Sequence, residues 1–310
     1  MRANPRHPTV SVVIPAYQGA ATIGRALESV AAQTRRDLEA IVVDDGSSDG
    51  TAEAARVALA EHGLDGQVVE RPRGGPGVVN NPGAARNAGI AAARGEFVAF
   101  LDADDKWEPR KLERSLAAFD AQPGLIGVCH AEVVRRDGQE VARNRYGTRL
   151  PLYWSLLLLD NCLSTSATVV RRDALTAVGW FSEAPEHASV EDYDLWIRLA
   201  RRGPFAFIDE PLGEYQLHDA AITTNVERHL GATLAVIDLN FERAFGPRLN
   251  AWQRALARQR RMRAMRQAAM ALRRAGRHDR AAALCRRAVE EWPLSPKLWA
   301  AAAMIARTRC

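Results

Sequence analysis

Three aspartates carry the strongest chemical signal in this chain, because they stand together directly after an apolar run at 97–101. They are Asp102, Asp104 and Asp105. Such a run is typical of a strand buried on both faces, and these strands deliver their carboxyl ends to the ligand crevice of an open α/β sheet. Carboxylates at this density repel one another unless a cation shares them, and Mg²⁺ or Mn²⁺ prefers hard oxygen ligands. An Asp-rich turn that caps the helix expected near Lys111 is the alternative interpretation.

Glu191 and Asp192 form a second group of acids, ahead of a segment whose apolar residues have helical spacing. These apolar residues are Leu195, Trp196 and Leu199. The spacing predicts a helix that begins at the two acids, where the helix dipole favours the ionised carboxylate that a general base requires. Capping of the helix is the structural alternative for Asp192, and capping and catalysis do not exclude each other.

Strand and helix patterns alternate along the first third of the chain, and these elements must position the acids. The predicted strands cover 10–14, 38–43, 67–70 and 97–101, and the predicted helices cover 20–33, an Ala-rich segment closed by Gly63, and 84–93. Ser48 or Asp49 would cap the middle helix. This alternation predicts an α/β fold of right-handed βαβ units around a mostly parallel central sheet.

Five short segments place the chain beside a known family. They are VVIPAY at 12–17, VVDDGSSDGT at 42–51, ARNAG at 85–89, FLDADD at 100–105 and EDYDLW at 191–196. Each is weak alone, but together they follow the order seen in family 2 glycosyltransferases. Over roughly residues 8 to 225 the chain resembles the catalytic domain of that family, which has the GT-A fold.

The resemblance implies a donor site at the ends of the first two strands. Pro15, Ala16 and Tyr17 would line the nucleoside pocket, and Asp45 would hydrogen-bond the base, usually uracil. Packing at a strand end is the alternative role for Tyr17. Arg86 would approach the diphosphate or its sugar, a role that suits a permanently charged fork of donors, whereas a salt bridge on the helix surface is the alternative.

The resemblance also implies a divalent metal, Mn²⁺ or Mg²⁺, held by Asp104. Asp102 would hold the donor's ribose or contribute through water, since these ions commonly retain several waters. His218 would be a second metal ligand or a loop anchor. Gln216 stands where many relatives carry Arg, which puts a diphosphate contact from this segment in doubt. The sequence has no Cys/His cluster with zinc spacing.

On the acceptor side, Asp192 matches the family's catalytic base and Glu191 is its neighbour. Attack opposite the departing diphosphate inverts the configuration. The resemblance therefore implies an inverting hexosyltransferase that uses a nucleotide-sugar, with UDP favoured over GDP or dTDP, in cell-envelope or polysaccharide synthesis. The residues at 126–181 do not identify the acceptor, which is a glycan, a lipid-linked molecule or another hydroxyl compound.

Two other functions remain open at this point. A non-catalytic nucleotide-sugar-binding scaffold would not need the intact acids at Asp45, Asp104 and Asp192. A sugar nucleotidyltransferase would carry a Gly-rich, basic phosphate loop directly after the first strand, where this chain has PAYQ at 15–18.

Composition indicates a two-domain protein. The chain has 310 residues, of which 47% are hydrophobic and 25% charged, enough for a full α/β core and an appended piece. We expect a flexible N-terminus at 1–8, a GT-A catalytic domain at 9–228 and a helical, partly tetratricopeptide-like extension at 229–310. The first residues have no apolar core, no run approaches about 18 apolar residues, and the cysteines are scattered, so we expect a cytoplasmic protein. The cysteines are Cys129, Cys162, Cys285 and Cys310.

The extension is strongly basic, with twelve arginines against two acids between Ala251 and Glu290. Apolar stripes predict two antiparallel helices, and a third is expected at 296–306. The stripes are Met265, Ala269 and Leu272, and then Ala281, Leu284, Ala288 and Trp292. Anionic membrane surfaces attract such a face, so peripheral contact at the inner face of the cell membrane is one hypothesis, and a merely solvated basic face is the other. No nucleic-acid partner is expected, because interleaved aromatic residues for stacking are missing.

Overall fold

The computed structural model describes residues 8–72, 81–147, 150–217 and 226–292. The chain divides into two compact units. The first comprises Met1–Leu152 and Cys162–Leu217, and the second comprises Tyr153–Asn161 and His218–Cys310. We describe each unit by itself.

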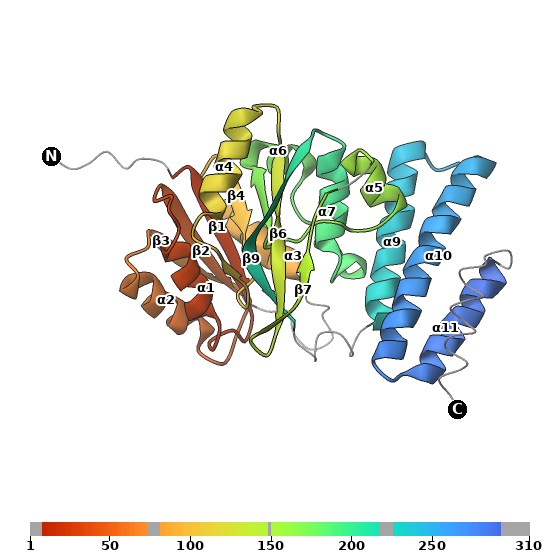
Figure 1. The fold of residues 1–310 in the computed structure, drawn as a ribbon, viewed down its shortest axis with the longest axis horizontal. Coiled ribbons are helices and arrows are strands. Elements are labelled where there is room, and N and C mark those ends of the chain that lie inside the picture. The colour runs from red at the N-terminus through yellow and green to blue at the C-terminus, as the bar shows by residue number, and fades with distance from the viewer. Residues whose placement is uncertain (1–7, 73–80, 148–149, 218–225, 293–310) are drawn as a thin grey trace. The chain divides into compact units, whose positions relative to one another are not determined.

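The first unit is built on a sheet whose strand order is β3-β2-β1-β4-β8-β6-β9-β5, with β7 paired to β6 (Figure 1). Its first four strands are β1 (Val10–Ala16), β2 (Leu38–Asp44), β3 (Gly66–Glu70) and β4 (Phe97–Phe100). They are joined by α1 (Ile23–Ala31), α2 (Thr51–Glu61) and α3 (Pro82–Ala92). All pairs among these strands are parallel, as the alternation of strand and helix predicts.

The second half of the sheet is mixed. Its strands are β5 (Lys106–Trp107), β6 (Gly127–Arg136), β7 (Gln139–Asn144), β8 (Thr168–Arg171) and β9 (Phe205–Gln216). Its helices are α4 (Lys111–Ala121), α6 (Arg172–Val178), a 3-10 turn at Pro185–His187 and α7 (Glu191–Ala200). β6 and β9 are parallel, whereas β8 runs antiparallel to both β4 and β6.

Side chains on the two faces of the sheet pack against different helices. Alternate residues of β1, such as Val12 and Ile14, join the core formed with α1, α2 and α4. On the other face, α3 lies so close to β1 that a Cβ added at Gly89 would stand 2.4 Å from a Val13 methyl carbon. Phe100 meets Phe181 and Trp196 edge to face on this side, which ties β4 to the α6–α7 region.

The start of α2 corrects one prediction. Gly50, not Ser48 or Asp49, occupies the N-cap position, with φ +88°. Few side chains tolerate that left-handed conformation, and glycine adopts it without penalty. Asp49 still contributes, because its Oδ1 accepts a hydrogen bond of 3.1 Å from the Thr51 amide.

Strand order locates the ligand crevice. β1 has β2 on one side and β4 on the other, so the connections after β1 and after β3 run in opposite directions. In open α/β sheets such a switch point forms a crevice beyond the carboxyl ends of the strands. The residues after Ala16 and after Phe100 therefore lie at the edge of the sheet where this crevice forms.

The second unit contains α9 (Val226–Phe245), α10 (Ala251–Arg274) and α11 (His278–Glu291), and it also takes in most of α5 (Leu152–Leu158). Asn250 and Gln253 form a reciprocal capping box at the start of α10. Met265, Ala269 and Leu272 are buried, as predicted. The helix expected at 296–306 lies outside the described residues. Within the described parts of the chain, no helix is long and apolar enough to cross a membrane.

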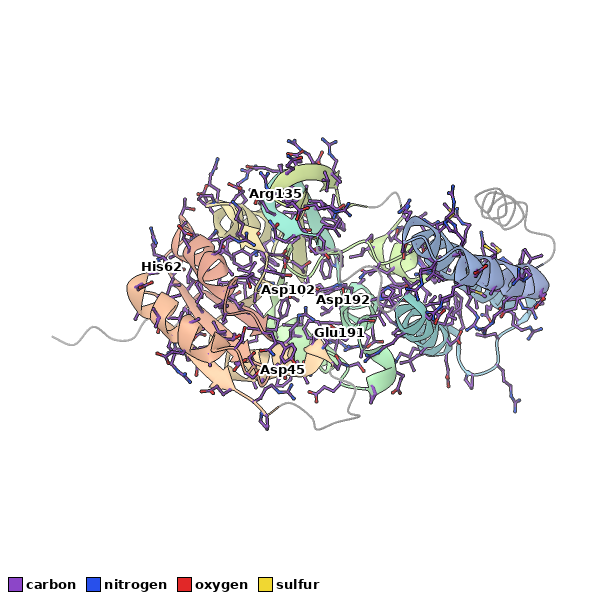
Figure 2. The ribbon with its side chains drawn as sticks, turned by 90° about the horizontal axis from the view of Figure 1, so that it is seen from below. Asp45, His62, Asp102, Arg135, Glu191 and Asp192 are labelled. Carbon is purple, nitrogen blue, oxygen red and sulfur yellow. The ribbon has the colours of Figure 1, made fainter. Side chains whose placement is uncertain are left out.

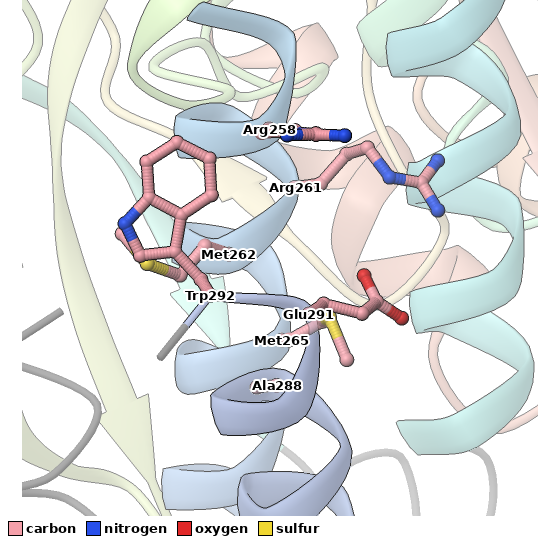
Figure 3. Close-up of a pocket in the computed structure, with 7 residues that line it drawn as sticks. All are labelled: Arg258, Arg261, Met262, Met265, Ala288, Glu291 and Trp292. Atoms are coloured by element: carbon pink, nitrogen blue, oxygen red, sulfur yellow. The ribbon is translucent and has the colours of Figure 1, made fainter. Parts of the chain in front are cut away.

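A cavity of about 300 Å³ lies between α10 and the end of α11 (Figure 3). Its lining combines apolar and charged side chains: Arg258, Arg261, Met262, Met265, Ala288, Glu291 and Trp292.

Candidate active site

The acidic loop after β4 gives its three carboxylates different environments. Asp105 is 1% exposed, and its Oδ2 and Oδ1 accept hydrogen bonds from Ser166 Oγ at 2.6 Å and from the Gln216 amide at 2.9 Å. Asp102 and Asp104 are half-buried. Burial, together with the charges of Asp102 and Asp104, raises the pKa of Asp105 well above its ordinary value. Asp105 thus anchors the loop, while the other two acids remain accessible to a ligand.

Arg86 of α3 holds two acids that are far apart in the sequence. Its guanidinium donates to Asp102 Oδ1 at 2.8 Å and to Glu191 Oε1 at 2.7 Å. Burial alone would lower the pKa of Arg86, but the charges of Asp102 and Glu191 outweigh it and keep the pKa above its ordinary value. The guanidinium is therefore a fixed cation that joins the end of β4 to the start of α7. The ion pair between Arg86 and Glu191 is buried, so it is not the salt bridge on the helix surface that was the alternative. The approach of Arg86 to a diphosphate stays a prediction.

Both predicted acceptor-side acids occupy the first turn of α7, as the helical spacing predicts. Glu191 is 4% exposed, and its Oε2 has no hydrogen-bond partner among the described residues. Burial raises the pKa of Glu191, and the paired Arg86 opposes that shift. Asp192 is more accessible, and its Oδ1 accepts a hydrogen bond of 2.7 Å from the Tyr193 amide. Of the two, Asp192 is the better placed to meet a substrate.

The ends of β1 and β2 lie together, as the predicted nucleoside pocket requires. The Asp45 amide donates to the Ala16 carbonyl at 2.9 Å, and the Gln18 amide donates to Ser47 Oγ at 2.9 Å. Tyr17 is 48% exposed, so about half of its surface is open to solvent. Pro15 is half-buried one position before Ala16. Asp45 is buried, and its carboxylate forms an ion pair with Arg71.

One pocket of about 460 Å³ brings the two acidic groups together. It is lined by Arg86, Asp102, Asn144, Tyr146, Leu163, Ser164, Thr165, Ser189, Glu191, Asp192 and Tyr215. Figure 2 shows Asp102, Glu191 and Asp192 close to one another in the first unit, with His62, directly after α2, far from them. Charged residues therefore form one part of the lining, and hydroxyl and amide side chains form the other.

The side chains of the acidic loop can supply only some of the ligands of a divalent cation. Across the parts of the chain that the structure describes, no group of three or more His, Cys, Asp or Glu side chains is arranged to hold a metal ion. Mg²⁺ and Mn²⁺ nevertheless often take only one or two carboxylates and complete their octahedron with water and substrate phosphates. Asp102 and Asp104 supply oxygen donors of that kind, so the donor set fits a metal shared with a bound diphosphate. His218 lies outside the described residues.

Three features of the site were missed by sequence reasoning. Arg71 directly follows the weak third strand, whose carboxyl end shares an edge with Asp45, so strand order could have revealed it. Gln216 binds Asp105 through its backbone amide, a contact that does not depend on the side chain at this position. Tyr146 and Ser164 stand outside helices and strands, so the sequence placed them only within the acceptor-side segment 126–181 and did not indicate that they share a pocket wall.

Comparison with known families gives two matches. A model of glycosyl transferase family 2 matches residues 11–178, and a tetratricopeptide repeat model matches residues 262–305. The first match covers more than half of the chain and includes the acidic loop after β4, but it ends before α7.

Two curated relatives are linked by name to polysaccharide biosynthesis. The succinoglycan biosynthesis protein ExoO of Rhizobium meliloti is 41% identical over 134 residues, which are 43% of this chain and 36% of ExoO. The amylovoran biosynthesis glycosyltransferase AmsB of Erwinia amylovora is 30% identical over 218 residues, which are 67% of this chain and 69% of AmsB. The chain therefore spans about a third of the length of ExoO.

Solved structures share the fold. S. aureus TarS 1–349 in complex with UDP-GlcNAc aligns with a TM-score of 0.64 and 17% identity, covering 97% of this chain and 91% of the TarS chain. The mannosyltransferase PcManGT of Pyrobaculum calidifontis, in complex with GDP-Man and Mn²⁺, aligns with a TM-score of 0.57 and 22% identity, covering 97% of this chain and 85% of that chain. At these identities the likeness establishes the fold alone.

Proposed function

Since the chain belongs to glycosyl transferase family 2, we propose that it transfers a sugar from a nucleotide-diphosphate donor to a hydroxyl acceptor, with inversion at the anomeric carbon. An inverting mechanism is typical of this family. One observation carries the proposal: a single pocket holds Asp102 at the end of β4 and Asp192 at the start of α7. The first acid belongs to the donor side of the reaction and the second to the acceptor side.

The donor nucleoside binds beyond the ends of β1 and β2. Asp45 accepts a hydrogen bond from the base, and an accepting carboxylate favours uracil, which has an imide N–H to donate. Tyr17 offers an exposed ring on which the base can stack. Arg71 forms an ion pair with Asp45 and so holds this carboxylate in place. The ligands bound to TarS and PcManGT, UDP-GlcNAc and GDP-Man, support a nucleotide-sugar donor, and we propose UDP as the nucleotide.

Asp104, with Asp102 beside it, would hold Mn²⁺ or Mg²⁺ against the diphosphate. Such an ion, when bound, neutralises the charge that develops on the leaving diphosphate. Arg86 contributes independently of the ion, because it fixes the Asp102 carboxylate within the pocket. Glu191, held by the same guanidinium, keeps one buried oxygen that can accept a hydrogen bond from a donor-sugar hydroxyl.

Asp192 removes the proton from the acceptor hydroxyl. The acceptor oxygen then forms a bond to the anomeric carbon while the bond from that carbon to the diphosphate oxygen breaks. The proton ends on Asp192 and the electron pair on the departing diphosphate. The position of Asp192 in the first turn of α7 supports this role, since the dipole at a helix N-terminus favours a negatively charged side chain.

The names of ExoO and AmsB support a role in polysaccharide or cell-envelope glycan synthesis. We place the reaction in the cytoplasm, where nucleotide-sugars are made, with the arginine-rich helices in peripheral contact with the inner face of the membrane. A sugar or lipid-linked sugar is then the acceptor.

A panel of nucleotide-sugars tests the proposal. The full chain is incubated with UDP-, GDP- and dTDP-hexoses with and without Mn²⁺, and free nucleotide and sugar are measured by mass spectrometry. We expect metal-dependent release of UDP from one UDP-hexose and slower release, or none, from the others. Binding of a nucleotide-sugar without any turnover would favour the non-catalytic scaffold. Absence of both binding and turnover across the panel would refute the proposed function.

A further inference from the structure

Glu132 is a buried carboxylate that the proposed reaction does not use. It lies on β6, in a run that is buried on both faces, and is 1% exposed. Its hydrogen-bond donors are two neutral hydroxyls: Tyr146 donates to Oε2 at 2.7 Å, and Ser164 donates to Oε1 at 3.1 Å. Burial raises the pKa of Glu132 to about 7. A buried acid is unfavourable for folding, so its presence behind a pocket points to a role in that pocket.

Tyr146 and Ser164 both line the pocket that contains Asp192. They come from different segments, one after β7 and the other before β8, and neither residue belongs to a helix or strand. The nearby Gly147 has φ +133°, a backbone conformation that residues with a side chain rarely adopt. Regular secondary structure therefore does not hold this wall, whereas Glu132 contacts both of its hydroxyls.

The two hydrogen bonds also set the chemical character of the wall. A hydroxyl has one hydrogen to donate and lone pairs to accept with. While Glu132 is ionised, it accepts only, so both hydroxyls direct their hydrogens to it and present lone pairs to the pocket. Such a wall suits a ligand that brings O–H donors, as a neutral carbohydrate does. When Glu132 is protonated, it donates to one hydroxyl, whose own hydrogen must then turn elsewhere.

We propose that Glu132 is a positioning residue that makes Tyr146 and Ser164 a hydrogen-bond-accepting wall for the hydroxyl groups of a neutral sugar acceptor. The inference rests on the proposed function and names the acceptor class of the same site. Several titratable or charged groups around Glu132 influence it electrostatically from other elements or along β6. They are Asp102 after β4, Lys111 of α4, Tyr146 after β7, Tyr215 of β9 and Cys129 of β6 itself.

The experiment uses the full chain with its UDP-sugar, Mn²⁺ and a panel of neutral p-nitrophenyl hexosides as acceptors. For the hexoside with the highest turnover, we expect Glu132→Gln to raise the acceptor KM about tenfold, as for the loss of one hydrogen bond. The kcat and the UDP affinity should stay within about twofold of wild type, since the donor site is untouched. Wild-type KM should rise as the pH falls through about 7, and KM of the variant should not.

Tyr146→Phe and Ser164→Ala keep the test decisive if Glu132→Gln does not fold. Each removes one hydroxyl and should raise the acceptor KM with little change in kcat. Tyr146→Phe should raise KM less in the Glu132→Gln variant than it does in the wild type. Glu140→Gln, an exposed acid on β7, is the matched control and should behave like wild type.

Different failures have different meanings. Unaltered KM in Glu132→Gln, a wild-type KM independent of pH, or no binding of any neutral hexoside beside UDP would each overturn the positioning role while donor hydrolysis persists. Loss of donor hydrolysis and of UDP binding in the wild-type chain would instead count against the proposed function itself.

Discussion

Individual side chains of the pocket differ sharply in how they are held. Arg86 and Glu191 form a buried ion pair that the half-buried Asp102 extends to a triad, and removal of either buried partner leaves an uncompensated charge. Asp192 lies beside the triad but is more exposed than Glu191. A rigid set of charges thus adjoins an accessible carboxylate, and the two can be separated by mutation.

Asp192→Asn should abolish transfer while donor binding persists. Asparagine keeps the shape of the side chain but cannot take a proton, and general-base assistance contributes about 10² to 10⁴ in rate. Turnover with a verified acceptor is measured beside UDP affinity. Asp173→Asn, in the first turn of α6, is the matched control and should keep its activity. Near-normal turnover of Asp192→Asn would show that another group takes the proton, and lost UDP affinity would move Asp192 to the donor site.

Asp104→Ala should remove the metal dependence of UDP binding without loss of the fold. The carboxylate is half-buried in a loop that Asp105 anchors separately, so its removal leaves those hydrogen bonds intact. Calorimetric titration of UDP with Mn²⁺, and again after chelation, measures the effect. Asp120→Ala, an exposed site on α4, serves as control. The assignment fails if the Asp104 variant still binds UDP more tightly with Mn²⁺ than without it.

Glu132 should also make stability depend on pH. Its pKa of about 7 in the folded chain lies above the ordinary value of 4.5, so folding favours the protonated form. The stability of the wild type relative to Glu132→Gln is therefore greatest below pH 4.5 and declines as the pH rises to about 7. The total change should be about 3 kcal/mol, since each pKa unit corresponds to about 1.4 kcal/mol.

Urea unfolding of both proteins between pH 4.5 and 8 checks this expectation. Glu61→Gln, exposed at the end of α2, is the matched control. If the difference in unfolding free energy between wild type and Glu132→Gln does not change with pH, the folded chain does not raise the pKa of Glu132.

At the scale of elements, the close approach of α3 to β1 brings Arg86 over the carboxyl ends of the strands. Gly89 permits this approach, because a Cβ at that position would stand 2.4 Å from a Val13 methyl carbon. Asn81 and Asn87 secure the same helix to the segment before α7 by donating to the carbonyls of Ser182 and Phe181. Helix placement and ion pairing are therefore coupled within the first unit.

Gly89→Ala should destabilise the protein by about 1–3 kcal/mol through overpacking, despite the better helix propensity of alanine. Gly24→Ala on α1 is the matched control, because nothing lies within 4 Å of its added Cβ. That change should be neutral or stabilising by up to about 1 kcal/mol. Chemical denaturation of the two variants compares them. Equal stability of both variants would mean that α3 can move away from β1 freely.

At the scale of the whole molecule, the second unit gathers segments that are distant in sequence. Residues 153–161 belong to it, although their flanking residues belong to the first unit. Within the helical unit, Asp160 accepts hydrogen bonds from Arg260 and Gln267, and Trp154 stacks with Phe245. Arg260 is 1% exposed and forms an ion pair with Asp160, whereas many other arginines of α10 and α11 face solvent.

Neutralising exposed arginines of the helical unit should weaken binding of the full chain to anionic vesicles. Each basic residue close to such a surface contributes about 1 kcal/mol. The variant replaces Arg263, Arg274, Arg277 and Arg286 with Gln, and the control makes the same change at Arg36, Arg110, Arg136 and Arg143 of the first unit. Co-sedimentation with phosphatidylserine vesicles measures binding, and donor hydrolysis should be unchanged in the first variant. Equal sedimentation of the two variants would contradict the membrane hypothesis.

The sequence alone predicted the features that depend on the periodicity of neighbouring residues. The parallel strands, the helix at Glu191 and the buried stripe of α10 follow from periodicity, and the acids at strand ends follow from the αβ alternation. Prediction was weaker at the cap of α2, where backbone conformation and not the polar side chain selected Gly50.

Only the tertiary structure determined which of these residues meet. Arg86 and Glu191 are 105 positions apart, and Tyr146 and Ser164 reach Glu132 across 14 and 32 positions. No local pattern encodes such contacts, because they depend on how helices and loops pack on the sheet and on which charges burial forces into pairs. For the same reason, the sequence could indicate candidate site acids but not the buried cation that holds two of them, nor the carboxylate behind the pocket wall.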